Sequence, residues 1–262
     1  AAGLDPRRML GPDQASRLAP DLRWRMRDTT DNTAGDGLVL PCAIGYRTVI
    51  VARPRADRCM GVVAADYDDA IDEYALDKPI ERLASPMWAN YVRGVVHELL
   101  QREPGGRSLR GMDMVIAGDV PQGAGLSSSA SLSVAVCTLF SGLPDYPGLG
   151  PIEAALVAQR AENDFVGCKC GNMDQISSAC GVQDHALLID CRSLEVKPVP
   201  IPAGAAIMII ESHITRGLVD SEYNTRRAQC EEAARYLGVP ALRDVDLAIL
   251  AEKGAGLDPV TL

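Results

Sequence analysis

The sequence lacks the charge and hydropathy features of proteins that bind polyanions or membranes. It contains no Lys/Arg-rich run, and acidic residues outnumber basic ones to give a net charge of -9, which argues against binding to nucleic acid or to an anionic membrane surface. No apolar run approaches the roughly 18 residues of a membrane span, and the start AAGLDPRRMLGPDQ has no apolar core of signal-peptide length. We therefore expect a cytoplasmic protein whose partners are small molecules.

The sequence also lacks a CxxC pair, although it has eight cysteines. Cys168 and Cys170 are close together, but a structural zinc site needs four ligands, and neither His185 nor His213 lies at zinc-finger spacing. The cysteines are scattered mostly among apolar neighbours. We expect reduced, structural thiols.

What is present is the composition of an ordinary globular protein, with 47% hydrophobic and 23% charged residues over 262 positions. That length suits one large domain or two domains that share a cleft. Hydrophobic periodicity predicts strands and helices mixed throughout the chain. The expected elements are β structure over 38–51, a helix over 87–101, a strand over 112–120, a helix over 152–166, β-rich sequence over 186–201, a buried strand over 205–212 (AAIMIIES) and a helix over 221–237.

The proline-rich stretch KPVPIPAG, residues 197–204, is the best candidate for a domain boundary. It divides the chain into an N-terminal part, residues 1–196, and a smaller C-terminal part, residues 197–262.

The most informative stretch is PQGAGLSSSAS, residues 121–131, which joins the expected strand to a following apolar segment. Gly123 and Gly125 allow the backbone to curl around an anion, and a helix that begins there presents free N–H groups and a positive dipole end. Serine hydroxyls add hydrogen bonds to phosphate oxygens, and one of them can reach Mg²⁺. A flexible Gly/Ser connector is the alternative, but a connector has no reason to be squeezed between a strand and a helix. The loop predicts a phosphate site.

This phosphate loop differs from the two best-known kinase loops. A Walker A motif requires a lysine directly after its last glycine, and here Leu126 follows Gly125. The chain also lacks HRD and DFG elements in order, which excludes a protein-kinase loop.

PQGAGLSSSAS resembles the second signature motif of the GHMP kinases, in the version found in galactokinases. AENDFVGCKCGNMDQISSACG, DHALLIDCRSL, SEYNTRRAQC, VLPCAI, WANYVRGVV and PALRDV also resemble galactokinase sequence. The resemblance covers roughly Gly37 to Pro259. It implies a two-lobed α+β GHMP kinase fold, with an N-terminal lobe like domain 2 of ribosomal protein S5 and a truncated C-terminal lobe.

The resemblance also implies the site residues. The loop that wraps the ATP phosphates would comprise Pro121, Gly123, Ala124, Gly125, Leu126, Ser127, Ser128, Ser129 and Ala130. Trp88 and Tyr91 would lie near the adenine, although core packing explains their spacing equally well.

Three further roles follow from the resemblance. Asp174 matches the aspartate that contacts the sugar hydroxyl and serves as base, although an aspartate after methionine is by itself more typical of a helix cap. Ser129 and Glu162 match the Mg²⁺ ligands; by itself Glu162 would be a solvated helix charge. Tyr223, which ordinary packing would also explain, and Asp31 match sugar-binding positions.

The sequence departs from the galactokinase pattern at both ends. The family's N-terminal signature resembles GRVNLIGEHTDYNDGFVLP, whereas this chain has APDLRWRMRDTTDNTAGDGLVLP, without the Gly-Glu-His core. The glycine-rich third motif, which resembles GGGFGGC, is absent as well. We expect a degraded gene product, a shortened homologue or a fragment, whose incomplete C-terminal lobe leaves apolar surface open to self-association.

The expected function is ATP-dependent phosphorylation of galactose at its C1 hydroxyl. Two alternatives remain open: an inactive sugar- or nucleotide-binding relative, and a kinase for N-acetylgalactosamine or another hexose.

Overall fold

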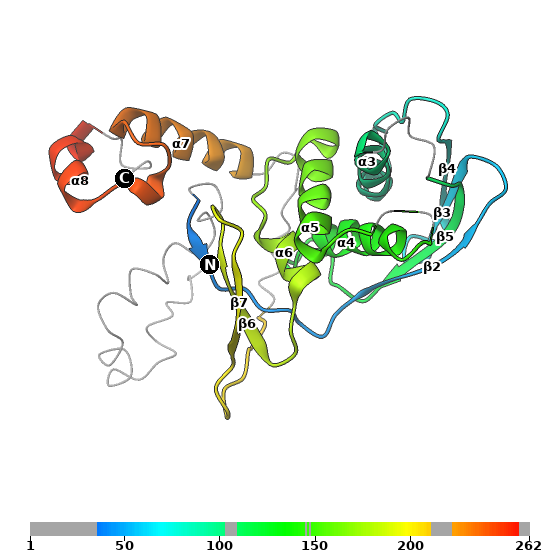
Figure 1. Cartoon of the computed structure of the whole chain (residues 1–262), viewed down its shortest axis with the longest axis horizontal. Coiled ribbons are helices and arrows are strands. Elements are labelled where there is room, and N and C mark those ends of the chain that lie inside the picture. The colour runs from blue at the N-terminus through cyan, green and yellow to red at the C-terminus, as the bar shows by residue number, and fades with distance from the viewer. Residues whose placement is uncertain (1–35, 103–108, 145, 147, 211–221, 257–262) are drawn as a thin grey trace, which may run out of the picture.

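The computed structural model describes residues 36–102, 109–144, 146, 148–210 and 222–256 of the chain. Within them two sheets lie against a group of helices, and a further helical segment follows the second sheet (Figure 1). Helices and strands are mixed along the chain, which confirms the expected α+β class. None of the helices in these ranges is long and apolar enough to cross a membrane.

The larger sheet has four strands in the order β2-β5-β3-β4. Their bounds are β2 (Thr48–Pro54), β3 (Cys59–Ala64), β4 (Ala70–Ala75) and β5 (Met112–Gly118). β3 and β5 are parallel and the other pairs are antiparallel. β5 is therefore an inner strand, and it delivers the chain directly to the glycine-rich loop.

The smaller sheet has three strands in the order β1-β6-β7. They are β1 (Leu38–Val39), β6 (His185–Asp190) and β7 (Val196–Pro200). The β structure expected over 38–51 is thus divided between the two sheets, because β1 pairs with β6 whereas β2 pairs with β5. The domain boundary predicted after residue 196 falls within β7, and the division into two parts stays a prediction.

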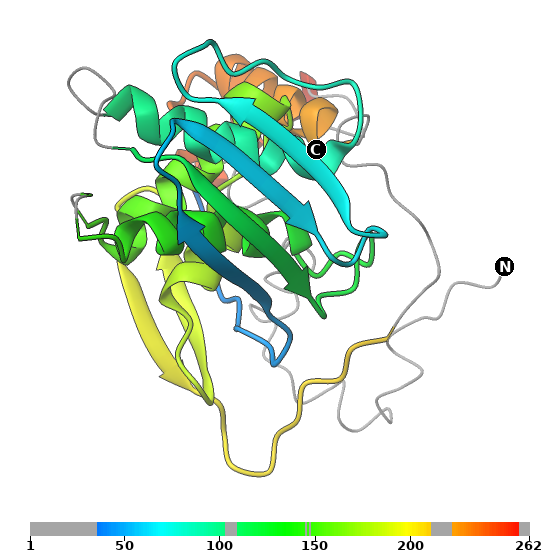
Figure 2. The same ribbon diagram turned by 90° about the vertical axis from the view of Figure 1, so that its right-hand side faces the viewer.

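The bounds of the helices are α3 (Met87–Arg102), α4 (Ser128–Ser141), α5 (Pro151–Arg160), α6 (Met173–Cys180), α7 (Glu222–Leu237) and α8 (Leu247–Lys253). Helices α3 and α4 lie next to one face of the larger sheet, α7 and α8 lie at the opposite end of the molecule (Figure 1), and the other face of the sheet is turned to the viewer in Figure 2. α3 and α7 agree with the expected helices to within one residue at each end. Gly238, which follows α7, adopts φ 76°, a left-handed conformation typical of a helix end.

Two hydrophobic cores hold these layers together. Alternate residues of the larger sheet, such as Met60, Val62 and Met114, point toward the helices and are fully buried with Phe140 of α4. A second core joins the smaller sheet to α5 and α6. α4, α5 and α6 therefore sit between the sheets, where the N-terminus of α4 and the following turns are held by packing on both sides.

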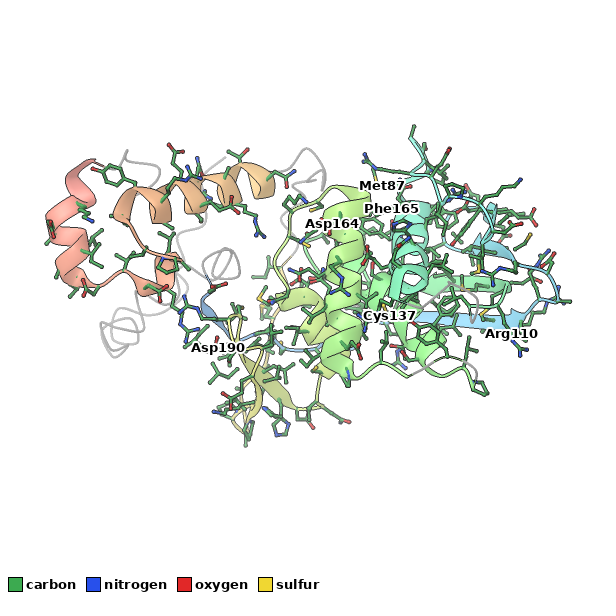
Figure 3. All side chains as sticks on the ribbon, turned by 45° about the horizontal axis from the view of Figure 1, so that its top comes forward. Met87, Arg110, Cys137, Asp164, Phe165 and Asp190 are labelled. Atoms are coloured by element: carbon green, nitrogen blue, oxygen red, sulfur yellow. The ribbon has the colours of Figure 1, made fainter. Side chains whose placement is uncertain are left out.

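The helix expected over 152–166 proves to be two structures. α5 is a regular helix, and residues Ala161–Val166 continue it as a π-helical turn that ends at Gly167, where φ is 95°. Phe165 lies on the side of this turn nearest α3 (Figure 3), with its ring 5.5 Å from that of His97. The sequence gives no sign of the wider turn, because its apolar spacing is close to that of an ordinary helix.

The prediction of a buried strand at AAIMIIES is wrong for the part that the structure describes. Residues 205–210 form no strand and are exposed, with Met208 at 78% of its full accessibility. An apolar run becomes a buried strand only when neighbouring strands pair with it, and none of the described strands does so.

Candidate active site

The glycine-rich loop between β5 and α4 adopts the conformation that its sequence predicts. Gly123, Gly125 and Ser127 have φ angles of 69°, 73° and 60°, all left-handed. A Cβ atom at either glycine would meet nothing within 4 Å, so the glycines satisfy a backbone requirement and not a steric one. The Ser127 side chain makes no capping hydrogen bond to α4. The first N–H groups of that helix are therefore not capped by it and can bind an anion.

A cavity of about 210 Å³ opens beside this loop. Gly123, Ser128 and Ser129 line it together with Trp88 and Tyr91 of α3. The structure thus brings together two parts of the predicted ATP site that are about 30 residues apart in the sequence. Of the remaining loop residues, Pro121, Ala124, Gly125, Leu126 and Ser127 belong to the same turn outside the cavity lining, and Ala130 is buried beneath it.

Trp88 and Tyr91 line this cavity, and the polar atoms of both side chains are buried. Both side chains are at least nine-tenths buried, and neither the indole N–H nor the tyrosine hydroxyl has a hydrogen-bond partner among the described residues. Burial raises the pKa of Tyr91, and the Glu162 carboxylate nearby raises it further. Leaving such a donor unpaired and buried has a free-energy cost, which these two side chains carry beside the cavity.

Glu162 lies on the π-helical turn and points to the start of α4. It is 3% exposed, and its carboxylate accepts a hydrogen bond from Gln175 Nε2 at 2.5 Å. Burial raises the pKa of Glu162 and the Asp174 charge adds to that rise, whereas the nearby Ser129 hydroxyl and the Gln175 amide oppose it. No arginine or lysine among the described residues forms an ion pair with this carboxylate.

A buried carboxylate without a cationic partner, next to a hydroxyl, fits Mg²⁺. Magnesium prefers hard oxygen ligands and is usually held by one or two protein groups together with phosphate and water. Ser129 and Glu162 supply such a pair. The described residues contain no cluster of three or more His, Cys, Asp or Glu side chains that would bind a metal alone, which agrees with a site completed by nucleotide oxygens.

Asp174 lies in the first turn of α6 and faces the same loop. Burial raises the pKa of its carboxyl group, and the nearby Ser127 hydroxyl opposes that rise. The two predicted carboxylates therefore lie near the N-terminus of α4 beside two serines that Ser128 separates, Ser127 for Asp174 and Ser129 for Glu162. α6 itself is not expected from the sequence pattern, because it is only eight residues long.

Two predicted sugar-binding residues are not placed in the site by the structure. Asp31 lies outside the described residues, and so does the side chain of Tyr223, although its backbone belongs to the first turn of α7. The next residue, Asn224, accepts a hydrogen bond from the Lys169 N–H at 2.9 Å. This bond holds the start of α7 beside the loop that joins Glu162 to Asp174.

Sequence reasoning missed the contribution of the β3–β4 turn to the cavity. Asp66 and Tyr67 line it, the Tyr67 hydroxyl donates to Gln122 Oε1, and the rings of Tyr67 and Trp88 lie 6.3 Å apart. No local pattern marks these residues, since they reach the site only through the pairing of β3 with β5. Gln175 was likewise not singled out.

Comparison with known proteins agrees with this geometry. Residues 90–182 match the model of the GHMP kinases N terminal domain. The structure is similar to that of Lactococcus lactis galactokinase complexed with galactose, with a TM-score of 0.75 and 25% identity over 89% of this chain and 61% of that one. A D-glycero-D-manno-heptose 1-phosphate kinase from Bacteroides thetaiotaomicron gives a TM-score of 0.49 and 21% identity over 63% of this chain and 51% of its own. The chain thus spans about three fifths of the galactokinase it resembles.

Proposed function

We propose that the chain is a sugar kinase that transfers the γ-phosphoryl group of ATP to the C1 hydroxyl of galactose, because residues 90–182 match the GHMP kinases N terminal domain and the fold is similar to that of a galactokinase. One observation carries the proposal: Asp174 and Glu162 both lie near enough to serines at the N-terminus of α4 for the hydroxyls of Ser127 and Ser129 to lower the pKa values of the two carboxylates. That is the arrangement needed to hold a phosphate, a cation and a proton acceptor side by side. Galactose is chosen because the solved structure with a TM-score of 0.75 is that of a galactokinase.

Asp174 is the proposed base. It accepts the proton of the sugar hydroxyl as the hydroxyl oxygen forms a bond to the γ-phosphorus and the bond from that phosphorus to ADP breaks. Partial burial raises its pKa, which makes the ionised carboxylate a better proton acceptor than an exposed aspartate. The Ser127 hydroxyl, which lowers the pKa of Asp174, places the carboxylate near the loop.

The loop and the α4 N-terminus are proposed to bind the ATP phosphates through the backbone from Pro121 to Ala130. Trp88 and Tyr91, whose buried N–H and O–H groups have no partner among the described residues, would contact the adenine. Ser129 and Glu162 would hold Mg²⁺, which when bound neutralises charge on the transferring phosphate. Asp31 and Tyr223 are proposed to contact the sugar.

Other aspects of the proposal rest on charge and composition. The net charge of -9 argues against nucleic acid and membrane surfaces as partners. We therefore propose galactose and ATP as the partners of a cytoplasmic enzyme, and self-association through the exposed segment 205–210 as a further possibility to be measured by sedimentation.

The test is ADP release by the purified 262-residue chain with Mg²⁺-ATP and galactose, beside N-acetylgalactosamine and glucose. Galactose should stimulate release, and Asp174→Asn should reduce the rate by about 10²- to 10⁴-fold, the usual contribution of a general base. Asp164→Asn is the matched control, because Asp164 is an exposed carboxylate on the π-helical turn that carries Glu162, whereas Asp174 lies on α6.

Three outcomes would contradict the proposal in different ways. Stimulation by N-acetylgalactosamine alone would support the assignment as a sugar kinase and contradict galactose as its substrate. Equal rates for Asp174→Asn and the parent chain would remove Asp174 from the role of base. Binding of nucleotide without turnover of any sugar would favour the inactive binding protein.

A further inference from the structure

Gln175 follows the proposed base on α6, but its side chain is turned toward the other carboxylate. It is 1% exposed. Its Nε2 donates to Glu162 Oε2 at 2.5 Å and to Cys170 Sγ at 3.6 Å. An ionised carboxylate only accepts hydrogen bonds, so the amide nitrogen and not the amide oxygen must face Glu162.

Burying the Gln175 amide at this position costs free energy. Gln175 Oε1 is buried and has no hydrogen-bond partner among the described residues. Burying an amide oxygen without a partner costs about 1–3 kcal/mol, and an apolar side chain of similar size, like that of the neighbouring Ile176, would avoid that cost. Packing alone therefore does not explain a glutamine here, whereas its contact with Glu162 does.

The neighbouring groups restrict how the Glu162 carboxylate can turn. Gln175 donates a hydrogen bond to it from α6, and the Ser129 hydroxyl lies near it at the start of α4. Gln175 Nε2 also donates to Cys170 Sγ, and Cys170 Sγ in turn donates to Asn163 Oδ1 at 3.4 Å. The carboxylate is thus fixed between two elements, and its remaining lone pairs are left for a third partner.

We propose that Gln175 is a positioning residue that fixes the orientation of the Glu162 carboxylate for a divalent cation held with a nucleotide. The inference rests on the proposed function, since it takes Glu162 as a cation ligand. Groups that orient a metal ligand typically contribute 10- to 100-fold to metal affinity. Gln175→Leu keeps the approximate volume and removes the donor, so it should weaken cation binding by about 10-fold or more.

The measurement is Mn²⁺ binding to the full chain in the presence of a non-hydrolysable ATP analogue, followed by the electron paramagnetic resonance signal of free Mn²⁺. Gln159→Leu is the matched control, because Gln159 Nε2 donates to the Cys170 carbonyl at 3.4 Å and none of its recorded hydrogen bonds reaches Glu162. It should bind Mn²⁺ as the parent chain does. Glu162→Gln, which weakens the ligand itself, should bind Mn²⁺ at least as poorly as Gln175→Leu.

A second readout distinguishes a changed orientation of the Glu162 carboxylate from a general loss of structure. In a turnover assay Gln175→Leu should raise the Mg²⁺ concentration at half-maximal rate by about 10-fold and retain most of the rate at saturating Mg²⁺. If Gln175→Leu does not fold, Gln175→Asn replaces it, since its shorter side chain keeps the polarity but withdraws the amide from Glu162.

The outcomes distinguish failure of the inference about Gln175 from failure of the proposed cation site at Glu162. Weakened Mn²⁺ binding in Glu162→Gln but not in a folded Gln175 variant overturns the inference and leaves the cation site intact. Unchanged Mn²⁺ binding in Glu162→Gln overturns the cation site, and the inference with it. Weakened binding in both variants, with Gln159→Leu unaffected, supports the inference.

Discussion

The buried ion pair between Asp72 of β4 and Arg93 of α3 is expected to be among the most sensitive points of the N-terminal part. Arg93 donates from Nε and Nη2 to the two oxygens of Asp72 at 2.8 and 2.7 Å, and the side chains are only 9% and 6% exposed. Arg93 also donates to the Glu81 carbonyl at 3.0 Å and lies 4.5 Å from the centre of the Tyr74 ring.

Asp72→Ala would leave the guanidinium buried without its counter-charge. Removing one partner of a buried pair costs about 3–5 kcal/mol. The Glu81 carbonyl and the Tyr74 ring remain, and a desolvated cation–π contact contributes up to about 2 kcal/mol, so we expect the lower part of that range, about 3 kcal/mol. That is a large share of the roughly 5–15 kcal/mol by which a domain is stable.

The assay is urea unfolding followed by circular dichroism, with Glu231→Ala as control. That variant removes the exposed Arg227–Glu231 pair within α7, which contributes at most about 0.5 kcal/mol. Arg93→Met combined with Asp72→Ala should recover part of the loss, because it also removes the unpaired charge. Equal free energies of unfolding for Asp72→Ala and Glu231→Ala would refute the reasoning.

Three further predictions concern the loop, the sheet and the proposed base. Gly125→Ala should cost about 1–2 kcal/mol, because φ at this position is 73°, and should weaken binding of an ATP analogue measured by calorimetry; unchanged affinity would count against the loop as the phosphate site. Gly111→Ala should destabilise the chain by about 1–3 kcal/mol in thermal unfolding, since its Cβ would lie 2.2 Å from the Asp57 carbonyl oxygen, whereas Gly45→Ala, with nothing within 4 Å, should not. Turnover should fall as the pH drops through the raised pKa of Asp174, because the base works only when ionised, so the acid limb of kcat/KM should lie above the ordinary aspartate value of about 3.9; a limb at or below that value would exclude Asp174 as its source.

The sequence predicts best the parts whose signals are local. α3, β5 and α7 are long, regularly patterned segments, and the structure places them within a residue or two of the expected bounds. The glycine loop is predicted from residue types alone, since Gly123 and Gly125 permit the left-handed angles that it adopts. The candidate carboxylates depend on the resemblance, because Asp174 and Glu162 look like ordinary helix charges in isolation.

What the sequence does not predict depends on distant partners. Tyr67 meets Trp88 only because β3 pairs with β5 and α3 packs on that sheet. Residues 205–210 have the composition of a strand, but a strand also requires neighbours to pair with. The role of Gln175 becomes visible only when Glu162 is known to face it.

The π-helical turn at Ala161–Val166 has a consequence for the placement of the two carboxylates of the candidate site. The Glu162 carbonyl accepts from the N–H groups of both Gly167 and Cys168, at 2.9 and 3.0 Å, so this turn contains more residues than a turn of α-helix. Successive residues of an α-helix differ by about 100° in direction. Deleting one residue within the turn would therefore rewind it to a regular helix and rotate whatever follows by about that angle. A deletion after Glu162 would change the direction in which the chain runs from Glu162 to Asp174, so the wider turn sets how these two carboxylates lie relative to each other.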